Sequence, residues 1–314
     1  MSDLRIIFMG TPDFSVATLK ALLEAKKNII AVITAPDKPA GRGRKINQSA
    51  VKKYALQQQL PILQPTNLKN EDFLGNLKQL KADLQIVVAF RMLPKQVWAM
   101  PTLGTFNLHA SILPNYRGAA PINWAIINGE TKTGVTTFFI NQKIDTGAIL
   151  MQKEVTISST TSAGELHDEL MHIGSNLVVE TVNAIENNTY TIKTQPIEDL
   201  KPAPKLNKNN CKINWKHTTD QIYNHIRGLN PYPAAYTFMK NGDETLEVKI
   251  YKTAKNLEKH AFPFGEIITT KKEMKVAVSD GFIHLLELKI AGKRKMDTLS
   301  LLNGFDVKEG ATMF

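Results

Sequence analysis

Short apolar runs alternate with amphipathic segments through the first half of the chain, and this alternation restricts the fold more than any other feature of the sequence. The runs 5–9, 29–34, 84–90 and 105–110 have the length and composition of buried strands, and 133–140 and 147–157 look like two further strands. Helical patterns separate the early runs, for example over 48–59 and 70–81. The alternation predicts an α/β domain with a mainly parallel sheet, in which ligands bind beyond the carboxyl ends of the strands.

The pattern changes after an amphipathic helix predicted over 163–187. Residues 195–215 are rich in proline, lysine and asparagine, which is typical of an extended linker. A short helix at 218–231 and about five short strand-like runs follow, and they predict a small β barrel, of which the OB type is a common case. We therefore expect an N-terminal domain at 1–194, a linker at 195–208 and an OB-like domain at 209–314.

The net charge of the chain indicates which kind of partner it binds, and its cysteine content indicates the cellular compartment. The 314 residues carry a net charge of +10, and a basic protein often binds a polyanion, usually nucleic acid; the alternative is a basic surface without such a partner. A single cysteine, Cys211, excludes an internal disulfide framework and a cysteine-rich zinc site, and it fits a reducing cytoplasm. Every apolar run is shorter than the ~18 residues of a membrane span, so we expect neither a span nor a signal peptide.

The first apolar run does not end in a dinucleotide fingerprint. A nicotinamide cofactor would require Gly-x-Gly-x-x-Gly there, with its phosphates at the helix N-terminus. Only Gly10 is present, and Pro12 lacks the amide donor that a phosphate would need. An NAD-dependent oxidoreductase is therefore disfavoured, and the segment is interpreted as a tight strand-to-helix turn.

A cationic segment follows the second apolar run. Residues 35–46 combine prolines and glycines with four cations, which are Lys38, Arg42, Arg44 and Lys45. The segment lacks the apolar periodicity of a helix or a strand, so we expect a mobile loop near the ligand-binding edge of the sheet. Such a loop suits contacts with a phosphate backbone and ordering on binding. The alternative is a solvated surface loop.

The third apolar run leads into Phe90, Arg91, Met92 and Leu93. Backbone amides and carbonyls after a buried strand could bind a flat heterocycle at this edge of the sheet. An ordinary strand-to-loop exit is equally compatible with these residues, and the sequence does not separate the two interpretations.

The fourth run opens the stretch FNLHASILPNYRGAAP, in which two polar residues stand two apart. On a strand, Asn107 and His109 point to the same face. Both side chains can donate to a developing oxyanion, and a histidine can also move a proton near neutral pH. Farther on, Asp145 falls in a turn between two strands, where a carboxylate beside an imidazole would hold its ring. A lone Asn-x-His pair is usually structural, but the pair, the proline turn and the aspartate together indicate a site.

These motifs resemble those of the folate-dependent formyltransferases. Asn107, His109 and Asp145 match the catalytic triad of that family. Its folate-side turn is matched by Ser111, Ile112, Leu113 and Pro114, with isoleucine in place of the commoner leucine. The resemblance implies a Rossmann-like formyltransferase domain and 10-formyltetrahydrofolate as the formyl donor, with Phe90 to Leu93 beside it and no metal.

Within that family, the chain is most similar to the branch that acts on methionyl initiator tRNA. MGTPDFSV, DKPAGRGRK and RGAAPINWAIINGE fit this branch, in which the arginine-rich loop enters the acceptor end of the tRNA, so Arg42 is the residue carried over. The resemblance also implies a cytoplasmic monomer. Three alternatives stay open: formylation of an amino-sugar nucleotide, formylation of glycinamide ribonucleotide, and an inactive tRNA-binding module.

Overall fold

The computed structural model describes residues 4–40, 45–196 and 200–314. Its contacts divide the chain into two compact units. The first consists of Met1–Gly118, Thr133–Val155 and His167–Lys201, and the second of Ala119–Lys132, Thr156–Leu166 and Pro202–Phe314. The second unit therefore includes two segments from the middle of the chain in addition to Pro202–Phe314.

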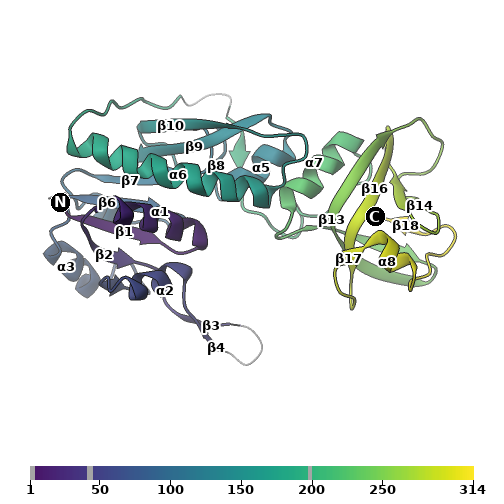
Figure 1. Cartoon of the computed structure of the whole chain (residues 1–314), viewed down its shortest axis with the longest axis horizontal. Helices are drawn as coiled ribbons and strands as arrows, with labels where there is room; N and C mark the ends of the chain where they lie inside the picture. The colour runs from purple at the N-terminus through teal and green to yellow at the C-terminus, as the bar shows by residue number, and fades with distance from the viewer. Residues whose placement is uncertain (1–3, 41–44, 197–199) are drawn as a thin grey trace. The chain divides into compact units, whose positions relative to one another are not determined.

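A seven-stranded sheet forms the centre of the first unit (Figure 1). Its strands lie in the order β10-β9-β7-β6-β1-β2-β5. The strands from β7 to β5 are parallel to their neighbours, and β9 runs antiparallel to β7. Their bounds are β1 Ile6–Gly10, β2 Ile29–Ile33, β5 Ile62–Leu63, β6 Leu84–Val88, β7 Thr105–His109, β9 Lys132–Phe139 and β10 Ile149–Thr156. The predicted α/β domain with a mainly parallel sheet is confirmed.

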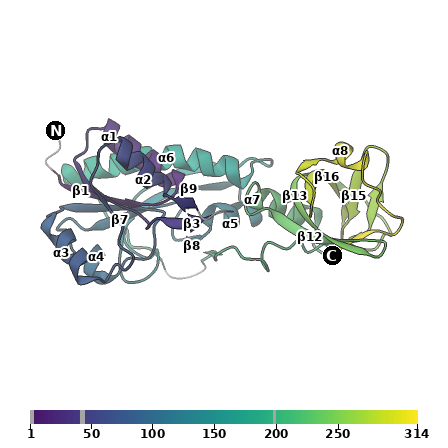
Figure 2. The ribbon, with the colours of Figure 1, turned by 90° about the horizontal axis from the view of Figure 1, so that it is seen from below.

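Helices cover both faces of this sheet, which is why β1 and β6 are buried at every residue. Figure 2 shows α1, α2 and α6 on one face and α3 and α4 on the other. On the second face, Ile7, Met9 and Val87 share one apolar core with Phe73 and Leu77 of α3. The helices are α1 Asp13–Glu24, α2 Ala50–Gln57, α3 Glu71–Gln79, α4 Lys95–Trp98 and α6 Ala163–Glu186.

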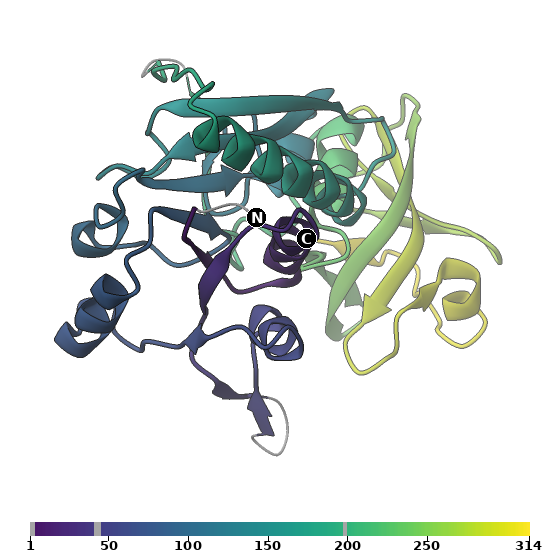
Figure 3. The same cartoon turned by 60° about the vertical axis from the view of Figure 1, so that its left-hand side comes forward.

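The cationic segment contains two short strands that the sequence did not predict. Strands β3 (Lys38–Ala40) and β4 (Lys45–Asn47) pair antiparallel, and they project from the body of the unit (Figure 3). Backbone pairing alone forms these strands, because they lack an alternating apolar pattern. The expected loop without regular structure is therefore wrong for these two ends of the segment.

An antiparallel sheet forms the centre of the second unit, with strand order β14-β15-β16-β13-β12-β18 and β17 paired to β16. A bridge between Glu266, which precedes β14, and Thr312 of β18 joins the two ends of this order, so the sheet closes on itself. The strands are β12 Ala235–Asn241, β13 Glu244–Leu257, β14 Ile267–Thr269, β15 Met274–Ala277, β16 Gly281–Ile290, β17 Met296–Asp297 and β18 Thr312–Met313. The predicted OB-like barrel is confirmed.

The core of the second unit begins within residues 195–215, the stretch rich in proline, lysine and asparagine. Cys211, Ile213 and Trp215 are buried in one cluster with Ile222 and Ile226 of α7. The Ile213 amide donates to the Tyr236 carbonyl at 2.8 Å, which attaches this stretch to the barrel. Lysine and asparagine residues surround these three residues in the sequence, so the average composition of the stretch is polar although the three side chains are buried. The remaining elements of the chain are α5 Pro121–Ile127, α7 Thr219–Leu229, α8 Thr298–Leu302, β8 Arg117–Gly118 and β11 Pro202–Ala203.

Candidate active site

Strand β7 presents Asn107 and His109 from the interior of the sheet, between β6 and β9. Alternation along the strand puts both side chains on one face. Asn107 is half-buried and His109 is only 6% exposed. A strand paired on both sides is a rigid support, so the spacing of the two polar groups is fixed by the sheet and not by a loop.

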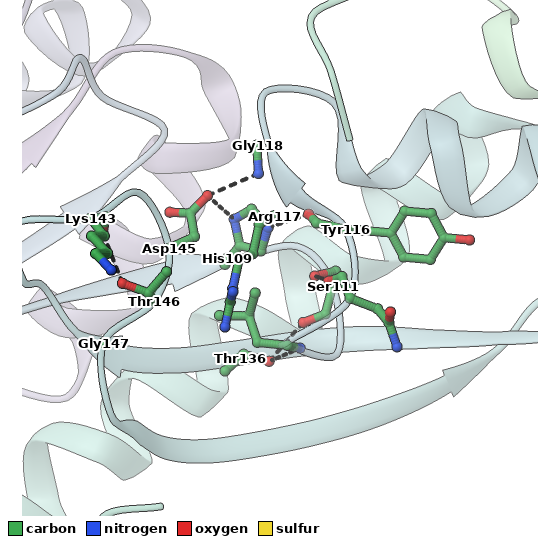
Figure 4. A network of polar contacts seen from close by, with 12 residues as sticks. His109, Ser111, Tyr116, Arg117, Gly118, Thr136, Lys143, Asp145, Thr146 and Gly147 are labelled. Atoms are coloured by element: carbon green, nitrogen blue, oxygen red, sulfur yellow. Dashed lines mark hydrogen bonds and ion pairs between the residues drawn. The ribbon is translucent and has the colours of Figure 1, made fainter. Parts of the chain in front are cut away.

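The imidazole of His109 lies between two acceptors. Its Nε2 is 2.8 Å from the carbonyl oxygen of Tyr116. Its Nδ1 is 3.9 Å from Oδ2 of Asp145, as Figure 4 shows. A carbonyl can only accept, so Nε2 must carry a hydrogen in this arrangement. Nδ1 is then the nitrogen that remains for Asp145 and for a substrate. The structure brings Asp145 and His109 together, as the sequence predicted.

The carboxylate of Asp145 is held by the backbone of a neighbouring strand. Its Oδ2 accepts a hydrogen bond from the amide of Gly118 at 3.0 Å (Figure 4). Asp145 has φ +51°, in the left-handed region that favours glycine. Gly147 follows, and a Cβ there would lie 1.5 Å from the carbonyl oxygen of Phe139, so only glycine fits. The turn between β9 and β10 is therefore shaped to direct this carboxylate.

The turn after β7 that contains Ser111 to Pro114, called the proline turn, is held in place by the hydroxyl of Thr136. The Thr136 hydroxyl donates to the carbonyl of Ser111 at 2.7 Å and accepts from the amide of Leu113 at 3.1 Å. Gln152 donates to the carbonyl of Leu113 at 2.9 Å. Sequence reasoning missed Thr136 and Gln152, because strand register, which a single sequence does not reveal, puts Thr136 opposite His109.

The four residues of this turn differ in what they offer a ligand. Ser111 and Leu113 are buried, whereas Ile112 and Pro114 are half-buried. The Ser111 hydroxyl is used inside the turn, where it donates to the carbonyl of Asn115 at 2.7 Å. The Ser111 hydroxyl is therefore engaged inside the turn, and the δ-methyl of Ile112 lies beside Gly134 of β9.

The loop after β6 lines a cavity of about 520 Å³. Arg91, Met92 and Leu93 are among its lining residues, and Phe90 instead packs against the core of the sheet. The guanidinium of Arg91 donates to the carbonyls of Thr66, at 2.9 Å, and of Pro65. Burial lowers the pKa of Arg91, but arginine stays cationic. Lys69 and Lys95 also line the cavity, which is therefore positively charged.

The base of the cationic hairpin is held by a half-buried ion pair. Lys52 Nζ lies 2.5 Å from Oδ2 of Asp37, and Gln64 donates to Oδ1 at 2.9 Å. These bonds lower the pKa of Asp37, with Lys52 the larger cause. Lys38 is exposed on β3, and the backbone of Lys45 pairs with that of Ala40. Arg42 and Arg44 lie outside the described residues.

Within 4–40, 45–196 and 200–314, no group of three or more His, Cys, Asp or Glu side chains could hold a metal ion. Among the helices of the same residues, none is long and apolar enough to cross a membrane.

Family comparison identifies both parts of the chain. Residues 4–182 match the formyl transferase family, and residues 205–306 match the formyl transferase C-terminal domain. The chain belongs to the formyl transferase family. As a member, it is a transferase of formyl groups, and the resemblance noted in the sequence is confirmed.

Individual relatives match the formyl transferase over its whole length. A methionyl-tRNA formyltransferase from Flavobacterium johnsoniae is 57% identical, with 100% of both chains covered. One from Bacteroides thetaiotaomicron is 52% identical over 99% of this chain and 98% of its own. Among solved structures, an N-formyltransferase from Helicobacter canadensis in complex with folinic acid and dTDP-3-aminofucose has a TM-score of 0.67 at 22% identity, covering 93% of this chain and 100% of its own. That likeness shows a shared fold.

Proposed function

We propose that this protein transfers the formyl group of 10-formyltetrahydrofolate to the α-amine of methionyl initiator tRNA. The observation that carries the proposal is identity of 57% and 52%, over nearly the full length, to two methionyl-tRNA formyltransferases. The match extends through both the sheet and the barrel. A shared sheet alone would support formyl transfer without indicating the acceptor.

The reaction forms one C–N bond and breaks another. The amine attacks the formyl carbon, and the carbonyl oxygen becomes an oxyanion in a tetrahedral intermediate. Collapse of the intermediate expels N10 of the folate, which takes up a proton, while the attacking nitrogen loses one. No covalent intermediate on the enzyme is needed, so the protein has to position both substrates and stabilise the charge that develops.

Three residues have roles in this step. The amide of Asn107 donates to the oxyanion, and cationic His109 donates to the same charge from Nδ1–H, because its Nε2–H faces the Tyr116 carbonyl. Asp145 lies 3.9 Å from Nδ1, so its charge orients the ring and favours the protonated imidazole. Its carboxylate can also relay the proton of the amine through water. Preorganised donors of this kind contribute about 3 kcal/mol each in comparable sites.

The folate occupies the edge of the sheet where β6 and β7 end. The turn from Ser111 to Pro114 supplies one wall, and the loop from Phe90 to Leu93 supplies the other. Both loops leave neighbouring parallel strands, which supports a shared ligand. The cations of the cavity beside Leu93 suit the carboxylates of a folate.

The tRNA is bound through cationic residues. The phosphates near the acceptor end are contacted by Lys38, Arg42, Arg44 and Lys45. The basic OB-like domain at 209–314, which the linker at 195–208 joins to the catalytic domain, binds farther along the tRNA. The domain at 1–194 carries out the transfer. The protein acts in the cytoplasm as a monomer and has no membrane partner.

The test is incubation with 10-formyltetrahydrofolate and charged initiator tRNA, followed by detection of formylmethionine after hydrolysis of the ester. Formylated methionine is the expected product. A parallel reaction offers a dTDP-linked amino sugar, because the Helicobacter canadensis enzyme shares the fold. Formylation of the sugar without formylation of the tRNA would overturn the proposal, and loss of both activities would favour an inactive tRNA-binding module.

A further inference from the structure

Gln195 brings a buried amide to the turn that carries Asp145. The segment before it pairs with the start of β10, where the amide of Ile149 donates to the carbonyl of Lys193 at 2.8 Å and the reverse bond is 2.9 Å. This pairing puts Gln195 beneath the turn between β9 and β10, with 6% of the residue exposed. A buried amide is retained only where its hydrogen bonds are made.

The amide of Gln195 joins three parts of the chain. Its Nε2 donates to the carbonyl of Asp145 at 3.1 Å and to the carbonyl of Gly147 at 2.7 Å. Its Oε1 accepts from Nε and Nη2 of Arg117 at 3.1 and 2.6 Å. Carbonyls only accept and a guanidinium only donates, so a flipped amide would lose all four bonds. The chemistry of the partners therefore fixes the orientation of the group.

These contacts hold the backbone on both sides of Thr146, opposite the carboxylate of Asp145. The left-handed conformation at Asp145 is retained only where the surroundings impose it. The amide of Gln195 supports this conformation by binding the backbone carbonyl of Asp145. The backbone amide of Gly118 binds the carboxylate of the same residue. Loss of either contact would free the turn to relax.

Gln195 also binds the guanidinium of Arg117, a cation that could otherwise pair with the carboxylate of Asp145 and compete with His109. Burial lowers the pKa of Arg117, and the nearby charge of Asp145 offsets part of this shift. An arginine fork is a strong bidentate partner for a carboxylate. In the structure the fork of Arg117 points to Gln195 and to the carbonyl of Pro196, and Asp145 is left to Gly118 and His109.

We propose that Gln195 is a positioning residue for formyl transfer: it fixes the turn and engages Arg117 so that the Asp145 carboxylate is directed to His109. The inference rests on the proposed function. The variant Gln195→Met keeps the side-chain volume but removes the hydrogen bonds. We expect its kcat to fall about 10- to 100-fold, as small misplacements of catalytic groups do, with KM for both substrates within about twofold.

Gln142→Met is the matched control, because Gln142 is an exposed glutamine in the same turn. Its kcat should equal that of the unchanged protein. A general loss of folding in Gln195→Met would instead reduce the active fraction, which active-site titration with a folate analogue measures. An equal kcat in Gln195→Met and in the control would overturn the proposal.

A double-mutant cycle separates positioning from general support. In the Asp145→Asn background there is no charge left to direct, so Gln195→Met should change kcat by less than about twofold. The same 10- to 100-fold loss in both backgrounds would mean that Gln195 acts independently of Asp145, and the proposal would be wrong.

A readout that needs no activity distinguishes failure of this inference from failure of the proposed function. In protein labelled with ¹⁵N-histidine, the ring signals of His109, assigned with His109→Asn, should move in Gln195→Met and stay in place in Gln142→Met. Unchanged His109 signals would overturn the inference even if the protein formylates tRNA. Moved signals in a protein that fails to formylate tRNA would leave the inference standing and remove the proposed function.

Discussion

The carboxylate of Asp145 faces Nδ1 of His109 at 3.9 Å, while the opposite nitrogen of the ring is occupied by the carbonyl of Tyr116 at 2.8 Å. The two contacts fix the plane of the imidazole from both ends. The same carboxylate oxygen is held by Gly118, so the pair behaves as one preorganised unit.

Replacement of His109 should therefore reduce turnover more than substrate binding. For His109→Ala we expect kcat to fall about 10²- to 10³-fold, the loss typical of one oxyanion donor, with little change in folate affinity. Steady-state kinetics and folate binding by fluorescence give the two quantities. His172→Ala removes an exposed histidine from α6 and should have no effect. Near-normal turnover of His109→Ala would refute the role of the ring.

The hydrogen bonds that join Thr136 of β9 to the proline turn can be tested by substituting threonines of that strand. Thr136→Val removes the hydroxyl that bonds Ser111 and Leu113, and leaving those buried groups unpaired should lower the free energy of unfolding by about 1–3 kcal/mol. Because the turn loosens, KM for the folate should rise. Urea unfolding and kinetics measure the two effects.

Thr133→Val is the control for this experiment, since Thr133 lies on the same strand and its buried hydroxyl has no hydrogen-bond partner within the described part of the chain. Its stability should be unchanged or slightly higher. Equal destabilisation by both substitutions would show that strand packing, and not the bonds to the turn, determines the result.

Whether the sequence could predict a feature depends on how far apart in the chain the interacting residues lie. The strands of the first sheet follow from apolar runs such as Ile6 to Met9, because full burial makes a run continuous whatever its partners are. The closeness of His109 and Asp145 was predictable from motif and topology. The bonds of Gln195 and Thr136 were not, because they depend on register between segments far apart in the chain.

The ion pair beneath the cationic hairpin gives a pH dependence with a definite sign. Lys52 and Gln64 lower the pKa of Asp37, so folding is favoured by this group above its unfolded pKa of about 3.9, and the contribution disappears as pH falls through the lower folded value. Asp37→Asn should therefore be less stable than the unchanged protein at pH 7, and the difference should shrink below about pH 4.

Urea midpoints at pH 7, 5, 4 and 3 test this dependence. Glu180→Gln removes an exposed carboxylate from α6 and should leave the midpoint at pH 7 nearly unchanged. A stability difference for Asp37→Asn that stays constant from pH 7 to pH 3 would show that the carboxylate charge does not stabilise the base of the hairpin.

Substitution of Arg42 tests whether the cationic segment contacts tRNA. For Arg42→Ala we expect KM for charged tRNA to rise and the logarithm of affinity to depend about one unit less steeply on the logarithm of salt concentration, because one phosphate contact is lost. Lys78→Ala removes the same charge from α3 and should alter neither quantity. A methionine ester without tRNA should be formylated equally by Arg42→Ala and by the unchanged protein. If Arg42→Ala lost as much activity on the ester as on tRNA, the segment would act on the chemistry or the fold and not on the nucleic acid.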